Sequence, residues 1–164
     1  MKLKLVGRLG AIAALAMAFV LAGTAPAHGQ WAASAGSAAS IPASALIQPQ
    51  ALNQILHENG KAKPLILQVG FSMMYREAHI AGAQYAGPAS QAAGQSLLRK
   101  TVEKLNRNTP IVIYCGCCPW GHCPNMWPAY QLLHEMGFTN LKALYLPDNF
   151  GTDWVSKGYL VDRP

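Results

Sequence analysis

Residues 111–125 read Ile-Val-Ile-Tyr-Cys-Gly-Cys-Cys-Pro-Trp-Gly-His-Cys-Pro-Asn, and this stretch holds all four cysteines of the chain. The apolar run at its start predicts a strand that is covered on both faces. The loop from Cys115 to Asn125 therefore begins at the mouth of a buried strand. Thiols gathered there indicate sulfur, redox or metal chemistry rather than packing, so we expect the functional site in this loop.

Helix and strand patterns alternate around this stretch. Apolar residues recur at helical spacing in three segments, whereas short apolar runs indicate strands in four others. Helices are predicted over 49–60, around 97–105 with Leu97, Leu98, Val102 and Leu105 on one face, and over 125–137; strands are predicted over 64–70, 83–86, 111–114 and 141–146. This order predicts an α/β class: a three-layer fold with a central, mainly parallel sheet flanked by helices, where ligands sit at the carboxyl ends of strands.

The first 27 residues have the pattern of a secretory signal peptide. Basic residues come first, an uncharged stretch over 9–23 follows, and Ala25-Pro26-Ala27 forms a cleavage pattern. The apolar run is shorter than the ~20 residues of a spanning helix, which disfavours an uncleaved anchor. Residues 28–44 are dominated by Ala, Ser and Gly and predict a flexible leader. We expect one domain over 45–164, located in the periplasm or secreted.

Charge and compartment restrict the function further. Three of the thirteen basic residues lie in the signal peptide, which leaves ten against seven acidic residues. This mild charge, without a basic run interleaved with aromatics, predicts no nucleic-acid partner, and membrane contact only through the signal peptide. Exported cysteines are usually paired, metal-bound or catalytic.

Five separated segments, in order, are similar to the rhodanese-like domain: 65–69, 77–83, 111–115, 137–141 and 154–159. The resemblance covers about the last 120 residues. It implies a compact α/β domain in which Cys115 is the catalytic nucleophile. Such a cysteine accepts sulfane sulfur as a persulfide from a small donor and passes it to an acceptor thiol, small or on a protein, without a cofactor.

Physical reasoning also selects Cys115. A loop that wraps around the sulfur and leads into a helix directs backbone N–H groups and the positive helix end at one place. This arrangement predicts a lowered thiol pKa and a more reactive sulfur. Asn125 suits the N-cap of the helix that follows.

The loop departs from the usual pattern of the family. It is enlarged and contains neither Arg nor Lys, which weakens the case for the dianion thiosulfate as donor and argues against a phosphatase. Its residues after the nucleophile are Gly116, Cys117, Cys118, Pro119, Trp120, Gly121, His122 and Cys123. We expect His79 to be a buried, hydrogen-bonded support for the loop. For His122, a role in the chemistry and a purely structural role remain equally open.

Three interpretations of the additional cysteines remain. Cys118 stands in a C-x-x-C pair with Cys115 and is a candidate to resolve an oxidised nucleophile. Alternatively, Cys118 and Cys123 form a disulfide that fixes the loop. A zinc or Cu(I) site is the third interpretation, disfavoured because every ligand would come from one tight loop. The sequence favours sulfur transfer without a metal; the alternatives are a thiol–disulfide redox protein, a metal-binding module or a non-catalytic binding module.

Overall fold

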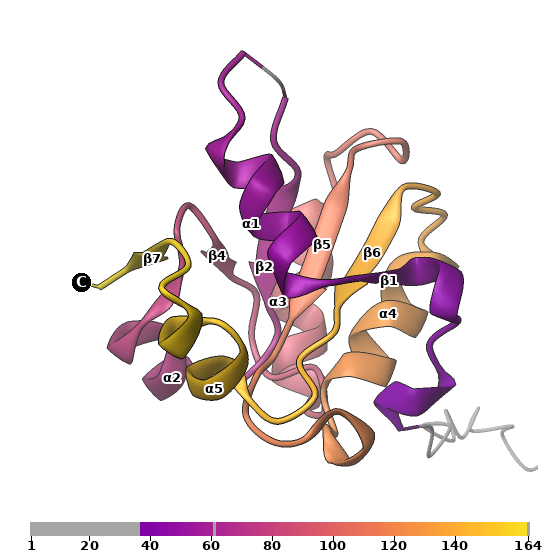
Figure 1. Ribbon diagram of the computed structural model, residues 1–164. Helices are drawn as coiled ribbons and strands as arrows, with labels where there is room; N and C mark the ends of the chain where they lie inside the picture. Colours follow the sequence, from indigo (N-terminus) through magenta and orange to yellow (C-terminus); the bar gives the residue numbers. More distant parts are fainter. Residues whose placement is uncertain (1–36, 61, 164) are drawn as a thin grey trace, which may run out of the picture. The chain divides into compact units, whose positions relative to one another are not determined.

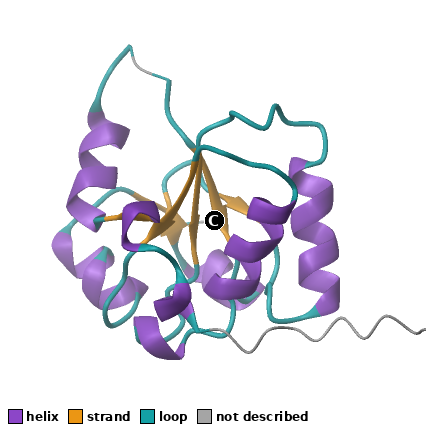
Figure 2. Cartoon of the chain, turned by 90° about the vertical axis from the view of Figure 1, so that its right-hand side faces the viewer, coloured by secondary structure: helices purple, strands orange, loops and turns teal. Residues whose placement is uncertain are grey.

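A parallel sheet of five strands forms the centre of the computed structural model, which describes residues 37–60 and 62–163. The strand order is β1-β6-β5-β2-β4, so β5 is central, and every neighbouring pair is parallel (Figure 1). Figure 2 shows the strands lying between helices on both sides. The strands are β1 (Leu46–Ile47), β2 (Leu65–Gln68), β4 (Gln84–Tyr85), β5 (Ile111–Tyr114) and β6 (Leu141–Leu144). The predicted strands 64–70, 83–86, 111–114 and 141–146 all occur, three of them shorter than predicted.

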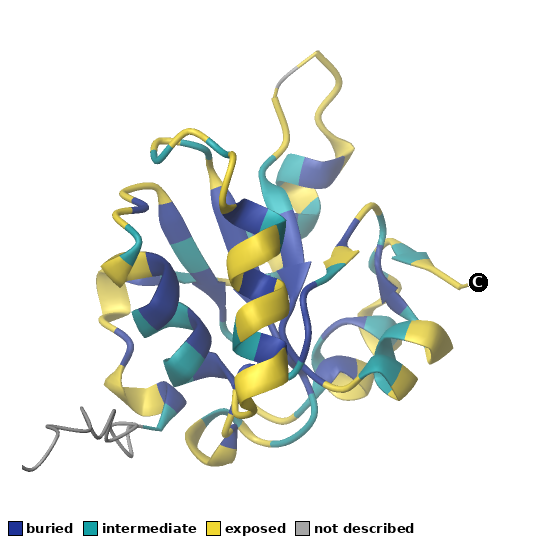
Figure 3. Cartoon of the chain, turned by 180° about the vertical axis from the view of Figure 1, so that it is seen from behind, coloured by how far each residue is buried: buried dark blue, intermediate teal, exposed yellow. Residues whose placement is uncertain are grey.

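Helices cover both faces of this sheet, as the three-layer prediction requires. They are α1 (Pro49–His57), α2 (Ser72–Glu77), α3 (Ala92–Val102), α4 (Met126–Glu135) and α5 (Phe150–Asp153). Alternate residues of a strand face opposite sides, so Ile111 and Ile113 pack with α3 and α4, while Val112 and Tyr114 pack with α1 and α5. Figure 3 shows the buried strands behind helices whose outer faces are exposed. Cys115 continues the first series and lies in the core on the side of α3 and α4.

A second, two-stranded sheet was not predicted. β3 (His79–Ile80) pairs antiparallel with β7 (Val161–Asp162), which brings the end of the described chain beside residues more than eighty positions earlier. The main-chain N–H of Ile80 donates to the buried hydroxyl of Tyr114 over 3.1 Å. This hydrogen bond joins the small sheet to the central strand.

Residues 37–44, which fall within the predicted leader 28–44, pack against the domain in the structure. Short 3-10 helices occupy Ala38–Ser40 and Ala43–Ala45, and both Ala38 and Ile41 are buried in the main core. A segment poor in large apolar residues can still be ordered when its few small and branched side chains fill a gap in a core. The predicted signal peptide and residues 28–36 lie outside the described residues.

One further difference concerns α3. Leu98 and Val102 are buried as predicted, whereas Leu97, predicted on the same apolar face, is 38% exposed. The remaining short helical turns are 3-10 helices at Trp120–His122 and Val155–Lys157.

Over residues 37–60 and 62–163, none of the helices combines the length and the apolar character needed to cross a membrane.

Candidate functional site

Two glycines allow the chain to fold closely around Cys115. Gly116 has φ of +73°, which favours glycine, and a Cβ there would lie 2.5 Å from the Cβ of Phe150. The N–H of Phe150 donates to the carbonyl of Gly116 over 3.0 Å, so the turn is fixed against the start of α5. On the neighbouring strand end, a Cβ on Gly70 would lie 2.8 Å from the Cys115 sulfur.

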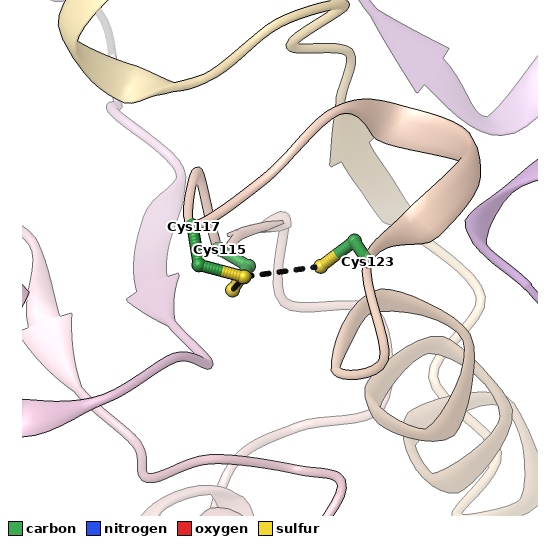
Figure 4. A group of neighbouring side chains, drawn as sticks. All are labelled: Cys115, Cys117 and Cys123. Carbon is green, nitrogen blue, oxygen red and sulfur yellow. Dashed lines mark hydrogen bonds between the residues drawn. The ribbon is translucent and has the colours of Figure 1, made fainter.

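The cysteine sulfurs converge at the end of β5. The Cys117 sulfur lies 3.2 Å from that of Cys115, 3.0 Å from that of Cys118 and 3.9 Å from that of Cys123. The sulfurs of Cys115, Cys117 and Cys123 all lie within 4.8 Å of one another, and Figure 4 shows these three side chains pointing together. All four cysteines are free thiols in this structure. Cys117 is thus the centre of the group, which the sequence did not indicate.

Asn125 stands at the predicted start of α4 but makes different contacts from those predicted. Its side chain forms no capping bond with the helix. Instead, its oxygen accepts from the N–H of Ser90 over 3.0 Å, and its nitrogen donates to the Cys115 sulfur over 3.3 Å. Because the Ser90 contact fixes the oxygen, the amide nitrogen faces the sulfur. Asn125 is completely buried and therefore belongs to the thiol site rather than to the helix end.

The prediction of a lowered thiol pKa is wrong for this arrangement. The pKa of Cys115 is raised to about 12, first because the hydrogen bond to Cys117 stabilises the neutral thiol, and also because burial disfavours the thiolate. A contact with Cys123 acts in the opposite direction but does not outweigh these effects. The pKa of Cys123 is likewise raised to about 12, first by its contact with Cys115. Burial raises the pKa of Cys118 to about 11.

The two histidines differ in position. His122 is exposed, and its described contact is a main-chain bond to the carbonyl of Pro119 over 2.9 Å, so its ring does not join the sulfurs. His79 is buried and hydrogen-bonded, as predicted, but its partner is the carbonyl of Tyr75 on α2 over 2.8 Å. Its ring also stacks on that of Tyr75 at 3.9 Å. His79 therefore supports α2 and β3 rather than the loop.

The outer loop residues form the rim of the site. Pro119 and Gly121 are exposed, whereas Trp120 is half-buried and packs edge-on against Tyr145 at 5.2 Å. The main-chain N–H of Trp120 donates to the carbonyl of Pro147 over 3.0 Å. These contacts attach the tip of the loop to the segment after β6.

A cleft of about 800 Å³ opens beside the thiols. Gly116, Cys117 and Cys118 line it on one side, and residues of α2, α5 and the chain end line the rest. Arg163 is the single basic side chain among these lining residues. Cys115 instead lines a small cavity of about 10 Å³. Residues 148–152 and Arg163 had not been predicted at the site, because they follow the sheet and are brought to the loop only by the fold.

A parallel α/β sheet whose central strand ends in a cysteine loop, followed directly by a helix, defines the class of sulfurtransferase-like domains. The chain belongs to the rhodanese-like domain family, whose sequence profile matches residues 48–146. The chain is a variant of that family with an enlarged, cysteine-rich loop.

Solved structures share the fold at low sequence identity. The Alr3790 protein from Anabaena sp. is 21% identical, with a TM-score of 0.55 over 72% of this chain and 82% of that chain. The BH2092 protein from Bacillus halodurans is 18% identical, with a TM-score of 0.57 over 73% and 77%. EanB in complex with hercynine is 19% identical, with a TM-score of 0.52 over 72% of this chain and 27% of that chain. None of the curated proteins matches the sequence significantly.

Proposed function

We propose that this protein is a sulfurtransferase that carries sulfane sulfur as a persulfide on Cys115. The observation that carries the proposal is the position of Cys115 at the end of the central strand of a rhodanese-like domain, with the Asn125 amide donating to its sulfur. Hydrogen bonds from N–H groups stabilise a sulfur anion more than a neutral thiol. The amide thus favours both the attacking thiolate and the persulfide that replaces it. The N-terminal sequence supports action outside the cytoplasm.

The reaction has two balanced halves. In the first half, the Cys115 thiol gives up its proton, which the departing donor takes up as it leaves as a thiol. The resulting Cys115 thiolate attacks the outer sulfur of a donor persulfide, forms a new S–S bond and releases the donor thiol. An acceptor thiolate then attacks the outer sulfur on Cys115, leaves with it as a persulfide and returns Cys115 to the thiolate. No external oxidant or reductant is consumed.

The surroundings favour persulfide donors over thiosulfate. The loop has neither Arg nor Lys, and Glu77 and Asp148 line the cleft together with Arg163. Such a mixed-charge wall offers no guanidinium cluster for a dianion. Since Cys115 is only 2% exposed and does not line the cleft, a donor reaches it when the Cys117 side chain turns aside.

Intact mass spectrometry tests this proposal. We expect reduced protein, incubated with glutathione persulfide, to gain one sulfur per chain that peptide mapping assigns to Cys115, and thiosulfate to load it less. A Cys115→Ser variant should gain none. Absence of added sulfur on the wild type, or equal loading of the variant, would reject sulfur transfer at Cys115.

A thiol–disulfide redox function is the second candidate, because the Cys115 and Cys117 sulfurs lie 3.2 Å apart. Here the structure favours a different partner from the sequence, which paired Cys115 with Cys118. Oxidation of the two thiols to a disulfide would give two electrons and two protons to a partner disulfide, which becomes two thiols. A reversible Cys115–Cys117 disulfide formed with a disulfide substrate, in protein that takes up no sulfur, would favour this function.

A further inference from the structure

We propose that Cys115, Cys117 and Cys123 form a three-thiolate binding site for Cu(I). The site shares Cys115 with the proposed sulfur transfer but does not depend on that activity. It gives Cys117 and Cys123 a role that transfer on a single nucleophile does not supply.

The positions of the three sulfurs carry the inference. They lie within 4.8 Å of one another, with separations of 3.2 Å and 3.9 Å from Cys117 to the other two (Figure 4). One ion placed between them is within reach of all three, because metal–thiolate bonds are about 2.3 Å long. Cys115 and Cys123 are 2% and 3% exposed, so these two ligands are already shielded from water.

The local fold removes the objection that a single tight loop cannot supply three ligands. The left-handed turn at Gly116 reverses the chain, so Cys117 faces back toward Cys115. The 3-10 helix Trp120–His122 then returns the chain, and Cys123 follows it directly. The three ligands therefore come from a strand end, a reversed turn and the exit of a short helix.

The surroundings select a soft ion of low coordination number. The small cavity beside the sulfurs is lined by Cys115, Cys118 and Cys123 with the apolar side chains of Trp120, Met126, Leu144 and Leu146, and includes neither a carboxylate nor an imidazole. Thiolate and thioether ligands select Cu(I), whereas hard cations need oxygen. Structural zinc is almost always four-coordinate. The fourth thiol, Cys118, lies 3.0 Å from Cys117 but falls outside the group of three whose sulfurs all lie within 4.8 Å of one another.

Asn125 completes the site as an outer partner. Its amide nitrogen donates to the Cys115 sulfur over 3.3 Å, and its oxygen is fixed by Ser90. Groups that hold a ligand in this way usually change metal affinity by about 10–100-fold when removed. An N–H donor also offsets part of the negative charge that three thiolates carry around one monovalent ion.

Binding is an exchange of protons for the metal without electron transfer. Three thiols lose three protons, three Cu–S bonds form, and copper remains Cu(I). While the ion is bound, the lone pairs of Cys115 are engaged, so Cu(I) and persulfide formation compete for the same sulfur.

The test is an anaerobic competition for Cu(I), supplied as its acetonitrile complex, between the reduced full chain and the chelator bicinchoninate. We expect one Cu(I) per chain to be withheld from the chelator. Cys123→Ser and Cys117→Ser should each weaken binding by more than about 100-fold, the upper limit for loss of an outer partner. Asn125→Ala should weaken it by about 10–100-fold, and His122→Ala, at an exposed ring outside the cluster, should leave it unchanged. Circular dichroism of each variant separates lost ligands from lost folding.

Specific outcomes overturn the site. The site is rejected if the wild type loses copper to the chelator as readily as folded Cys123→Ser does. It is also rejected if Cys118→Ser weakens copper binding as much as Cys123→Ser, or if the protein keeps one bound Zn(II) when Cu(I) is added. Persulfide loading of metal-free protein is measured separately. Loading without copper binding rejects this site alone, whereas copper binding without loading rejects the sulfurtransferase alone.

Discussion

The side-chain nitrogen of Asn125 donates a hydrogen bond to the Cys115 sulfur over 3.3 Å, at a point where neither residue is more than 2% exposed. The amide is held from its other end by the N–H of Ser90. Because this amide is buried and fixed, it cannot turn toward water. It therefore donates to the Cys115 sulfur both in the thiol and in the thiolate state.

Replacing Asn125 tests this contact. Asn125→Ala should lower the free energy of unfolding by about 1–3 kcal/mol, because it leaves the Ser90 N–H without its acceptor. Asn125→Asp keeps an acceptor for Ser90 but loses the donor to Cys115 and adds a negative charge, so it should slow alkylation of Cys115 by iodoacetamide. Urea unfolding and alkylation rates mapped by peptide mass measure the two effects. Equal alkylation in all three proteins would show that the amide does not act on the sulfur.

The strand and loop around Cys115 could be predicted because their patterns are local. A run of four apolar residues predicts a buried strand without any knowledge of its place in the sheet. Ile111–Tyr114 forms such a strand. The role of Asn125 could not be predicted, because its partner Ser90 lies 35 positions earlier. A residue at a helix start normally caps the helix, so the local pattern favoured the wrong partner.

The charge state of the thiols was mispredicted for a related reason. Helix and loop N–H groups suggested a lowered pKa, yet the hydrogen bond with Cys117 and burial raise the pKa of Cys115 to about 12. Neither burial depth nor the approach of Cys117 can be read from spacing along the chain.

The packing of Ala38 and Ile41 was missed because composition does not show which core an isolated apolar residue enters.

Stability should fall as pH rises above about 9. The pKa values of Cys115 and Cys123 are raised from 9.0 to about 12, and that of Cys118 to about 11. Between pH 9 and 12 the unfolded chain has therefore lost protons that the folded chain keeps, so unfolding becomes more favourable. Below pH 9 this contribution is fully present. Burial also raises the pKa of Tyr114, which acts in the same direction.

Urea unfolding in reductant at several alkaline pH values measures this dependence. Cys123→Ser removes one of the titrating thiols and should make the decline with pH shallower. A stability that is level or rising over the same interval would contradict the raised pKa values.

Tyr114 should stabilise the contact between the two sheets. Tyr114→Phe removes the hydroxyl that accepts from the Ile80 N–H over 3.1 Å and leaves a buried donor unpaired, at a cost of about 1–3 kcal/mol. Tyr145→Phe is the matched control, because phenylalanine retains both the ring packing with Trp120 and the main-chain hydrogen bond to Ile47. Denaturation midpoints compare the variants. Equal midpoints would mean that the hydroxyl does not link β5 to β3.

Gly70 should be required for the position of the Cys115 sulfur. A Cβ at Gly70 would lie 2.8 Å from that sulfur and 2.9 Å from the side-chain nitrogen of Gln68, which is itself buried. Its φ lies outside the left-handed region, so space alone restricts this position. Gly70→Ala should therefore cost about 1–3 kcal/mol through overpacking and reduce sulfur loading of Cys115 by displacing its side chain.

Gly121→Ala is the matched control for Gly70→Ala, because a Cβ at Gly121 meets no atom within 4 Å although that glycine lies in the cysteine loop. We expect this variant to keep the wild-type unfolding midpoint and sulfur loading. If the two variants have the same unfolding midpoint and the same sulfur loading, the close approach of Gly70 to Cys115 does not hold the sulfur in place. If Gly70→Ala alone loses loading while remaining folded, the end of β2 positions the nucleophile at the end of β5, and the site depends on two adjacent parallel strands rather than on the cysteine loop alone.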